Sequence, residues 1–365
     1  MLSVCLITRN EEASLPRALQ SVRDVAGEII VADTGSTDRT DQIAKDFGAT
    51  VVHFPWCDDF SAARNFAIGQ AHGDWIFWLD ADEELLPESL SELRSSMART
   101  EALAYFVRRQ DLQDANRLDY FTTMWQLRLF RRREDLKFIG RCHPHFEPSE
   151  WEVAEKTGQQ VLQSPITMRH YGYVGELRPA KLQRGARLLE MELRDHPGQL
   201  YYLVEFGRTL LVLGEEKRGH EILCQAMAQV IPRLNEAEIA GPVVAQLLEY
   251  FLMLPAERLP AGLTAELLEA VTRRWFLSSA PLVWLLARRA ADSGQLEDSE
   301  RLLRRLVQMG AEQSYDQWVS FDPRLVGSDA KLNLGVCLVR QNKIEEARSI
   351  FTGLLASPDR AREAQ

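Results

Sequence analysis

The sequence of 365 residues contains little cysteine and no long apolar run. Its five cysteines are scattered and form no CxxC pair, which argues against a disulfide framework or a zinc site and fits a reducing compartment. The longest apolar stretch, around residues 243–254, is interrupted by Gln246 and Glu249 and falls short of the ~20 residues that a membrane-spanning helix needs. We therefore expect a cytoplasmic protein without a transmembrane segment.

An excess of basic charge is also missing. The chain has 43 Lys and Arg residues against 53 Asp and Glu residues, which gives a formal net charge of -10. This balance does not indicate a general affinity for nucleic acid or for an anionic membrane. The composition, 45% hydrophobic and 26% charged, is that of a globular protein with room for one large domain or two smaller ones.

The sequence changes its pattern near residue 175. Before this point, segments typical of β-strands alternate with amphipathic helical segments. The expected strands are 2–8, 28–33, 50–54 and 74–80, with later β-like segments at 104–109, 122–130 and 161–173, and the expected helices are 14–23 and 40–47. Because the first strands are mostly apolar and are separated by single helices, we predict an α/β domain over residues 1–175 with a sheet covered on both faces.

Residues 176–365 are typical of an all-α domain, beginning with an expected helix at 181–195. Three segments, 205–226, 285–306 and 333–354, each carry a small residue, a turn and a second helix with apolar positions at steps of three and four. They resemble tetratricopeptide repeats, although their spacing departs from a steady ~34 residues. Two interpretations remain open: a bundle that only stabilises the first domain, or a solenoid that binds a peptide or protein partner.

Polar residues follow three of the expected strands, as Thr8–Glu12, Asp33 and Asp80. In open α/β sheets, ligands bind beyond the carboxyl ends of the strands, so these three segments predict one ligand site. Asp80 and Asp82 form a DxD pair, and hard oxygen ligands of this kind suit Mg²⁺ or Mn²⁺ shared with substrate phosphates. The alternative is that the acidic residues of this segment complement the dipole of a following helix.

Four blocks in the first domain carry a more specific signal. They read SVCLITRNEEASLPRALQSV, EIIVADTGSTDRT, FPWCDDFSAARNFAIGQAHGDWIFWLDADEEL and RHYGY. In order and spacing they resemble the inverting glycosyltransferases of family 2, and most closely the subgroup with a C-terminal tetratricopeptide-like domain. The resemblance implies the GT-A fold, a mixed Rossmann-like sheet, and a hexosyltransferase that takes its sugar from a nucleotide-sugar, with UDP as the expected nucleotide.

The resemblance also implies roles for residues of the nucleotide pocket. Asp33 would recognise the base, because a carboxylate at a strand end can accept the imide N–H of uracil. Thr8, Asn10 and Glu11 would line the same pocket. The alternative for the segment from Asp33 to Asp38 is a turn that caps a helix, and both roles can coexist.

A second group of residues would hold the diphosphate and the metal. The resemblance implies that Arg64 contacts the diphosphate or the ribose, where a planar guanidinium suits paired oxygens. Asp80 would lie near the ribose and the metal, and Asp82 would be the direct ligand of Mn²⁺ or Mg²⁺. His170 would complete the metal site, with a purely structural histidine as the alternative. Asp58 and Asp59, upstream of Arg64, are expected to cap a helix, with a contact to the donor sugar as the alternative.

The catalytic base is expected in the segment GRCHPHFEP. Inverting transfer benefits from a group that takes the proton of the acceptor hydroxyl. Many relatives carry a His-Glu pair here, whereas this chain has Pro144 in place of the glutamate. His143 and Glu147 are therefore the two candidates. Arg128, in QLRLFRRR, is expected to approach the donor phosphate or the acceptor, with a solvated basic strand as the alternative for the arginines after it.

These observations predict a metal-dependent inverting glycosyltransferase. Its acceptor hydroxyl would belong to a cell-envelope glycan, a lipid-linked saccharide, or a peptide or protein. One alternative is a helical-repeat adaptor with a catalytically silent sheet domain, but a scaffold has no need for aligned carboxylates. Another is a nucleotidyltransferase, which usually has a glycine- and basic-rich phosphate loop after its first strand. The segment after Ile7 contains neither glycine nor lysine.

Overall fold

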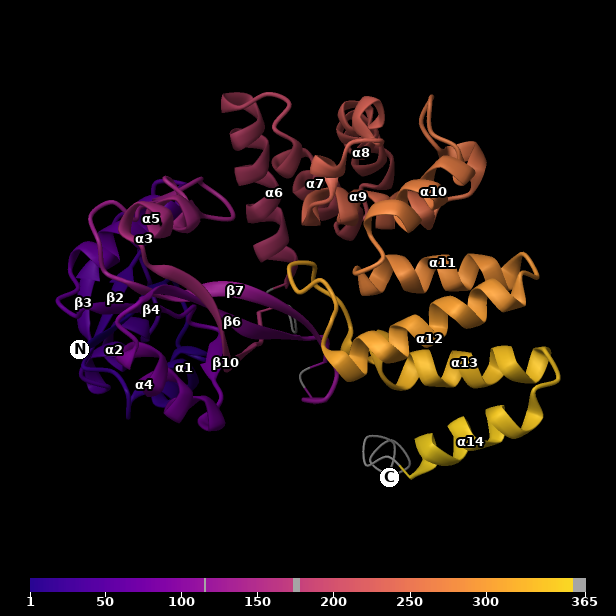
Figure 1. Ribbon diagram of the computed structural model, residues 1–365. Helices are drawn as coiled ribbons and strands as arrows, with labels where there is room; N and C mark the ends of the chain where they lie inside the picture. The colour runs from indigo at the N-terminus through magenta and orange to yellow at the C-terminus, as the bar shows by residue number, and fades with distance from the viewer. Residues whose placement is uncertain (115, 173–177, 357–365) are drawn as a thin grey trace. The chain divides into compact units, whose positions relative to one another are not determined.

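The computed structural model describes residues 1–114, 116–172 and 178–356 and consists of two compact units, Met1–Pro197 and Gly198–Gln365 (Figure 1). The boundary expected between residues 175 and 176 falls outside the described residues. Helix α6 (Arg178–Asp195) belongs to the first unit, so the compact units divide after this helix and not before it.

The first unit contains an eight-stranded mixed sheet with the order β3-β2-β1-β4-β7-β6-β10-β5. Its strands are β1 (Leu2–Thr8), β2 (Glu28–Asp33), β3 (Thr50–His53), β4 (Trp75–Trp78), β5 (Glu83–Leu85), β6 (Ala102–Leu112), β7 (Phe121–Arg131) and β10 (Gln160–His170). Strands β1 to β4 are mutually parallel, and β7 runs antiparallel to both β4 and β6. The short strands β8 (Phe138–Ile139) and β9 (His145–Phe146) form a separate hairpin.

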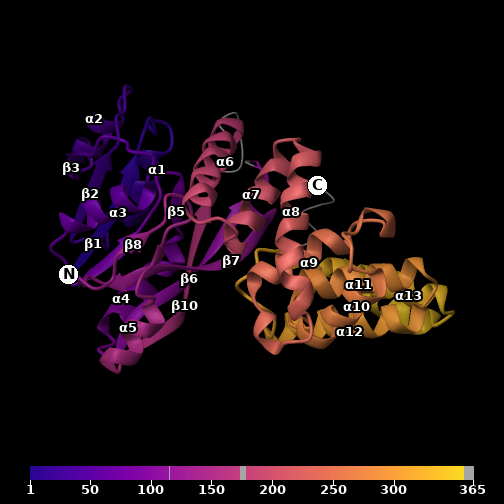
Figure 2. The ribbon, with the colours of Figure 1, turned by 90° about the horizontal axis from the view of Figure 1, so that it is seen from above.

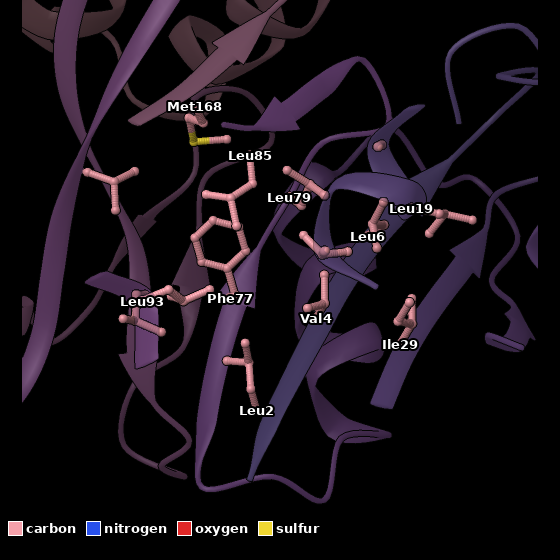
Figure 3. Packing of buried hydrophobic residues seen from close by; sticks show 14 of the residues in the cluster. Leu2, Val4, Leu6, Leu19, Ile29, Phe77, Leu79, Leu85, Leu93 and Met168 are labelled. Atoms are coloured by element: carbon pink, nitrogen blue, oxygen red, sulfur yellow. The ribbon is translucent and has the colours of Figure 1, made fainter. Parts of the chain in front are cut away.

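Helices cover both faces of the sheet because alternate side chains of the central strands are apolar on either side. On one face Leu2, Val4 and Leu6 of β1 pack with Phe77 and with buried residues of the helices α1 (Leu15–Val22), α2 (Thr40–Asp46) and α4 (Leu90–Ala98). Figure 3 shows this core. On the other face Ile76 and Trp78 of β4 pack with α3 (Phe60–Gly69), α5 (Glu150–Thr157) and the β8–β9 hairpin.

The acidic segment after Asp82 forms the short edge strand β5, and its pairing with β10 fixes where the segment lies. Glu83 pairs with His170 and Leu85 with Met168, antiparallel to β10. The acidic residues after Asp82 therefore continue as a strand, and the alternative of a helix beginning at this point is wrong. This pairing places His170 beside the DxD segment, although 88 positions of sequence separate His170 from Asp82.

The second unit is helical. Its α-helices are α7 (Leu200–Val212), α8 (Glu216–Val230), α9 (Pro242–Leu252), α10 (Ala265–Trp275), α11 (Ala280–Asp292), α12 (Leu296–Glu312), α13 (Ser328–Arg340) and α14 (Ile344–Leu355). Consecutive helices from α11 to α14 lie side by side (Figure 1), and Figure 2 shows α11, α12 and α13 from above. In the described part of the chain no helix is long and apolar enough to cross a membrane.

The three repeat-like segments are helical hairpins. In α7–α8, α11–α12 and α13–α14 the two helices are joined by three residues, and the middle one has a positive φ: Gly214 (82°), Gly294 (75°) and Asn342 (62°). A left-handed residue of this kind ends one helix and turns the chain into the next. Gly207 allows α7 and α8 to approach closely, since a Cβ there would lie 2.6 Å from Leu223 Cγ. The predicted α/β domain followed by a helical region is confirmed.

Candidate active site

The carboxyl ends of β1 and β2 form the nucleotide side of the candidate site. The two strands are parallel and in register, with Thr8 opposite Asp33. Asp33 Oδ1 accepts hydrogen bonds from the backbone N–H groups of Gly35 and Ser36, both at 2.9 Å, and Thr8 Oγ1 lies 3.3 Å from Oδ2. Burial alone would raise the pKa of Asp33, but these hydrogen bonds and the Ser36 hydroxyl lower it. Asp33 is therefore a carboxylate whose Oδ2 can accept a further hydrogen bond.

The segment after β1 is attached to the segment after β2. The backbone N–H of Asn10 donates to Ser36 Oγ at 2.9 Å, and its side-chain Oδ1 accepts from the N–H of Thr37 at 2.8 Å. The N–H of Glu11 donates to Thr40 Oγ1 at 2.8 Å. Hydrogen bonds thus join the segment that contains Thr8, Asn10 and Glu11 to the segment that contains Asp33, as a shared pocket requires.

Asp80 is held by its neighbours at the end of β4. Its Oδ2 accepts hydrogen bonds from Arg128 Nη1 and Nη2 at 3.2 and 3.1 Å, and its Oδ1 accepts one from Trp78 Nε1 at 3.0 Å. Burial raises the pKa of Asp80, but the guanidinium groups of Arg128 and Arg64 lower it to about 2. Arg128 also donates to the fully buried Glu83 at 2.6 Å. With only 4% of its surface exposed, Arg128 is buried beside Asp80 and Glu83, and its expected contact to the donor phosphate or the acceptor stays a prediction.

Arg64 projects from α3 toward the same carboxylate. Asp59 caps this helix by accepting a hydrogen bond from the N–H of Ala62 at 2.9 Å, as expected. Arg64 Nη2 lies 3.6 Å from Asp80 Oδ1, and its guanidinium packs 4.6 Å over the ring of Trp78. Its buried Nε has no hydrogen-bond partner among the residues that the structure describes. A buried donor without a partner is uncommon in proteins and needs an explanation, so Arg64 stays a candidate for contact with a ligand.

Asp82 and His170 lie together between β4 and β10. His170 Nε2 is 3.6 Å from Asp82 Oδ1, and its Nδ1 is 2.6 Å from Asp111 Oδ1. Asp111 in turn pairs with Arg109 Nε at 2.9 Å. Burial lowers the pKa of His170, but the hydrogen bonds to Asp111 and Asp82 raise it to about 9, so without a metal the ring is cationic at neutral pH, and a metal at Nε2 would displace the proton there. Because Asp111 accepts the proton of Nδ1, Nε2 of His170 is turned toward Asp82.

These residues fit a divalent cation. A carboxylate and an imidazole are ligands that Mn²⁺ and Mg²⁺ sites use, and an imidazole oriented by a carboxylate through its other nitrogen is the usual arrangement at metal centres. Gly172 also matters, since a Cβ there would collide with both Asp82 Oδ2 and His170 Nε2. Glycine at this position therefore keeps a side chain away from the two donors. Asp80, whose oxygens are held by Arg128 and Trp78, is less available as a ligand.

In the described residues a different trio, Asp33, Asp41 and His53, offers one ligand atom from each residue, and these three atoms lie within 4.8 Å of one another. The side chain of His53 is 67% exposed, and Asp33 Oδ1 is already engaged with two backbone N–H groups. This trio therefore suits a surface ion pair better than a metal site.

Sequence reasoning missed Asp111 and Lys181. Lys181, on α6, lies with Nζ 2.5 Å from Asp82 Oδ2 and 3.8 Å from Glu11 Oε1. A signal for Asp111 existed, because polar residues interrupt the apolar run of β6 near its end. For Lys181 the local sequence offered none, since a lysine on an amphipathic helix is usually solvated.

The two candidates for the catalytic base lie on the β8–β9 segment. His143 is exposed in the turn of this hairpin, with φ 51°, and Glu147 is exposed directly after β9. The turn is held near α3, because Ser61 Oγ donates to the carbonyl of Gly140 at 2.6 Å. Both candidates remain predictions.

In comparisons with known proteins, a family model matches most of the first unit. Residues 3–170 match the family described as Glycosyl transferase family 2. A "TPR repeat-containing protein" of Synechococcus elongatus is 41% identical over 238 residues, 63% of this chain and 57% of that protein. The "SPbeta prophage-derived glycosyltransferase SunS" of Bacillus subtilis is 30% identical over 226 residues, 60% of this chain and 51% of that protein. The chain thus spans about half the length of these relatives.

Solved structures are similar to this chain at lower sequence identity. TarS 1-349 of S. aureus, in complex with UDP-GlcNAc, is 15% identical with a TM-score of 0.37, covering 86% of this chain and 92% of that chain. Glucosyl-3-phosphoglycerate synthase from Mycobacterium tuberculosis, in complex with Mn²⁺, UDP and glucosyl-3-phosphoglycerate, is 25% identical with a TM-score of 0.27, covering 30% of this chain and 44% of that chain. Residues 3–170 are thus similar to the domains of Glycosyl transferase family 2, and several relatives of this chain are named as glycosyltransferases.

Proposed function

We propose that this protein transfers a sugar from a UDP-sugar to an acceptor hydroxyl, with inversion at the anomeric carbon and with a divalent metal ion. The observation that carries the proposal is the grouping of Asp82, which follows β4, with His170 and Gly172 at the end of β10, in a region similar to family 2 domains. A nucleotidyltransferase is less well supported, because β1 is followed by carboxylates and not by a glycine-rich phosphate loop.

The nucleotide is assigned to the rim of β1 and β2. Asp33 Oδ2 would accept the imide N–H of uracil, and Thr8, Asn10 and Glu11 would surround the base and ribose. The hydrogen bonds of Asp33 to backbone N–H groups support this role, because they hold the carboxylate ionised and in place before the ligand arrives.

The diphosphate is assigned to the space between Asp82 and Arg64. Asp82 and His170 would hold Mn²⁺ or Mg²⁺, and Asp80 would contact the ribose while Arg128 and Trp78 keep it oriented. When bound, the metal would offset the charge that develops on the diphosphate leaving group. Arg64 would donate from its guanidinium to a phosphate or ribose oxygen, and its buried Nε has no partner among the described residues.

On the acceptor side, the proposal names two alternative residues for the base and a broad class of acceptors. We assign deprotonation of the acceptor hydroxyl to His143 or Glu147, and the acceptor to the saccharides, lipid-linked saccharides or peptides that such enzymes glycosylate. The helical region would present the acceptor or a protein partner. An adaptor without catalysis would leave unexplained why Asp80, Asp82 and Asp33 converge on one rim.

Calorimetric titration with UDP, with and without Mn²⁺, tests the proposal on the parent protein and on Asp82→Asn. We expect UDP to bind in the presence of Mn²⁺ and to bind at least about tenfold more weakly to the variant, because a metal ligand is lost. Asp135→Asn, an exposed carboxylate paired with Arg133, is the matched control. A folded parent protein that binds UDP under neither condition would refute the assignment. Binding would justify a screen of UDP-sugars for hydrolysis and transfer.

A further inference from the structure

Helix α6 supplies a cation to the centre of the site. Lys181 Nζ lies 2.5 Å from Asp82 Oδ2 and 3.8 Å from Glu11 Oε1, so it joins the acidic segment after β4 to the segment after β1. These are the segments to which we assign the metal and the nucleotide. A diphosphate that links a metal to a nucleoside must pass between them, and Lys181 lies on that route.

The position of Lys181 is built into the first unit. Arg187, six residues along α6, forms an ion pair with Asp58, with Nη1 2.8 Å from Oδ2. Near the end of α6, Glu192 accepts a hydrogen bond from the backbone N–H of Arg141. These contacts attach α6 to the segment before α3 and to the β8–β9 turn. The ammonium of Lys181 is therefore placed by a helix anchored along its length, and not by a free surface side chain.

A metal at Asp82 changes the partner of Lys181. The ammonium and a divalent cation both need the oxygens of Asp82, and two cations that close repel each other. Because Lys181 has a long flexible side chain with three donors, it can leave Asp82 and reach a neighbouring phosphate oxygen. Glu11, its second partner, lies at the nucleotide rim and gives the freed ammonium a nearby anion.

We propose, building on the function proposed above, that Lys181 is a binding residue for the diphosphate of the donor and that it exchanges Asp82 for the diphosphate when the metal binds. In this exchange Lys181 opposes the binding of the metal alone and favours the binding of the metal with the nucleotide. The site then takes up both together, which limits the binding of free metal ions.

Two titrations on Lys181→Met test the proposal, because its two consequences have opposite signs. Mn²⁺ alone, measured by electron paramagnetic resonance, should bind the variant more tightly than the parent. UDP at saturating Mn²⁺ should bind the variant more weakly. Each change should be about tenfold in Kd, the effect of one charge-assisted hydrogen bond. Uridine, which lacks phosphate, should bind the variant and the parent equally. Lys181→Arg should retain much of the affinity for UDP.

The control is Lys156→Met, which removes an exposed lysine of α5 in the same unit. If Lys181→Met weakens both titrations, Lys181 has a structural role; if it tightens both, Lys181 only competes with the ligands. If neither titration changes, Lys181 has no role in binding. Each of these three results would overturn the proposal for Lys181 and leave the proposed function intact. A parent protein that fails to bind UDP with Mn²⁺ would overturn the proposed function, and this proposal with it.

Discussion

At the scale of single residues, the feature that organises the metal site is a buried relay from Arg109 through Asp111 to His170. Each member fixes the next: Arg109 pairs with Asp111 at 2.9 Å, and Asp111 holds Nδ1 of His170 at 2.6 Å. Once His170 has lost one proton to a metal, the remaining proton can sit on Nδ1 or on Nε2, and only a proton on Nδ1 leaves Nε2 as a ligand. Asp111 selects that one, so we regard it as a positioning residue for His170.

Asp111→Asn should therefore weaken the binding of Mn²⁺ by about tenfold, the usual effect of removing a carboxylate that orients a metal-binding histidine. Titration of Mn²⁺ at one pH, followed by electron paramagnetic resonance, measures this loss. The exposed Asp135→Asn should bind Mn²⁺ as the parent does. An Asp111→Asn protein that unfolds more easily but binds Mn²⁺ normally would reduce Asp111 to a structural role.

At the scale of elements, Glu28 joins three strands of the sheet. From the first position of β2 it accepts hydrogen bonds from Ser3 Oγ on β1 at 2.5 Å and from the backbone N–H groups of His72 and Gly73, before β4, at 2.6 and 3.1 Å. Burial raises the pKa of Glu28, but the hydrogen bonds from Ser3, His72 and Gly73 lower it from an ordinary 4.5 to about 2. The ionised form is thus the one that stabilises the sheet.

A carboxyl group whose pKa is lowered by folding stabilises the fold above its ordinary pKa, and this stabilisation is lost as the pH falls toward the folded value. The first unit should therefore lose about 1–2 kcal/mol of stability between roughly pH 4.5 and pH 2 through Glu28, allowing for solvent screening. Urea unfolding at several pH values measures it. Glu28→Gln should be less stable at pH 7 and should show a smaller fall in acid, whereas the exposed Glu88→Gln should behave as the parent. Equal acid sensitivity in all three proteins would contradict this account.

At the scale of the whole molecule, every residue assigned to the donor lies in the first unit, while α7–α14 form the second. Hydrogen exchange with UDP and Mn²⁺ should therefore protect peptides of the segments after β1, β2 and β4 most strongly. At ligand concentrations of about 100 times Kd, binding stabilises by about 2.7 kcal/mol. Removal of the metal with EDTA should abolish most of this protection. Protection concentrated in the helical unit, or unaffected by EDTA, would contradict the assignment.

Local sequence was enough to predict several elements. The strands β1 and β2 have the predicted bounds, because each is a short and nearly continuous apolar run whose length and flanking polar residues identify it. The helical hairpins were likewise visible, because Gly214 and Gly294 terminate helices by a local backbone requirement. Helices α4 and α5 and strand β5 were not predicted. Strand β5 and helix α4 are short segments with weak periodicity, whereas α5 has a local signal that was missed, the capping box of Ser149 and Glu152 with Gly158 at its end.

The sequence by itself determined the order of the two regions, the apolar strands and the acidic and polar residues at their ends, because these depend on interactions between near neighbours in the chain. It also identified Asp33, Asp80, Asp82 and His170 as candidates through a resemblance in motif. Only the tertiary structure decided that Arg128 is buried behind Asp80, that Asp111 orients His170, and that Lys181 reaches Asp82. Each of these contacts joins residues 48 to 99 positions apart, and such a contact exists only after the sheet and α6 have brought its two residues together.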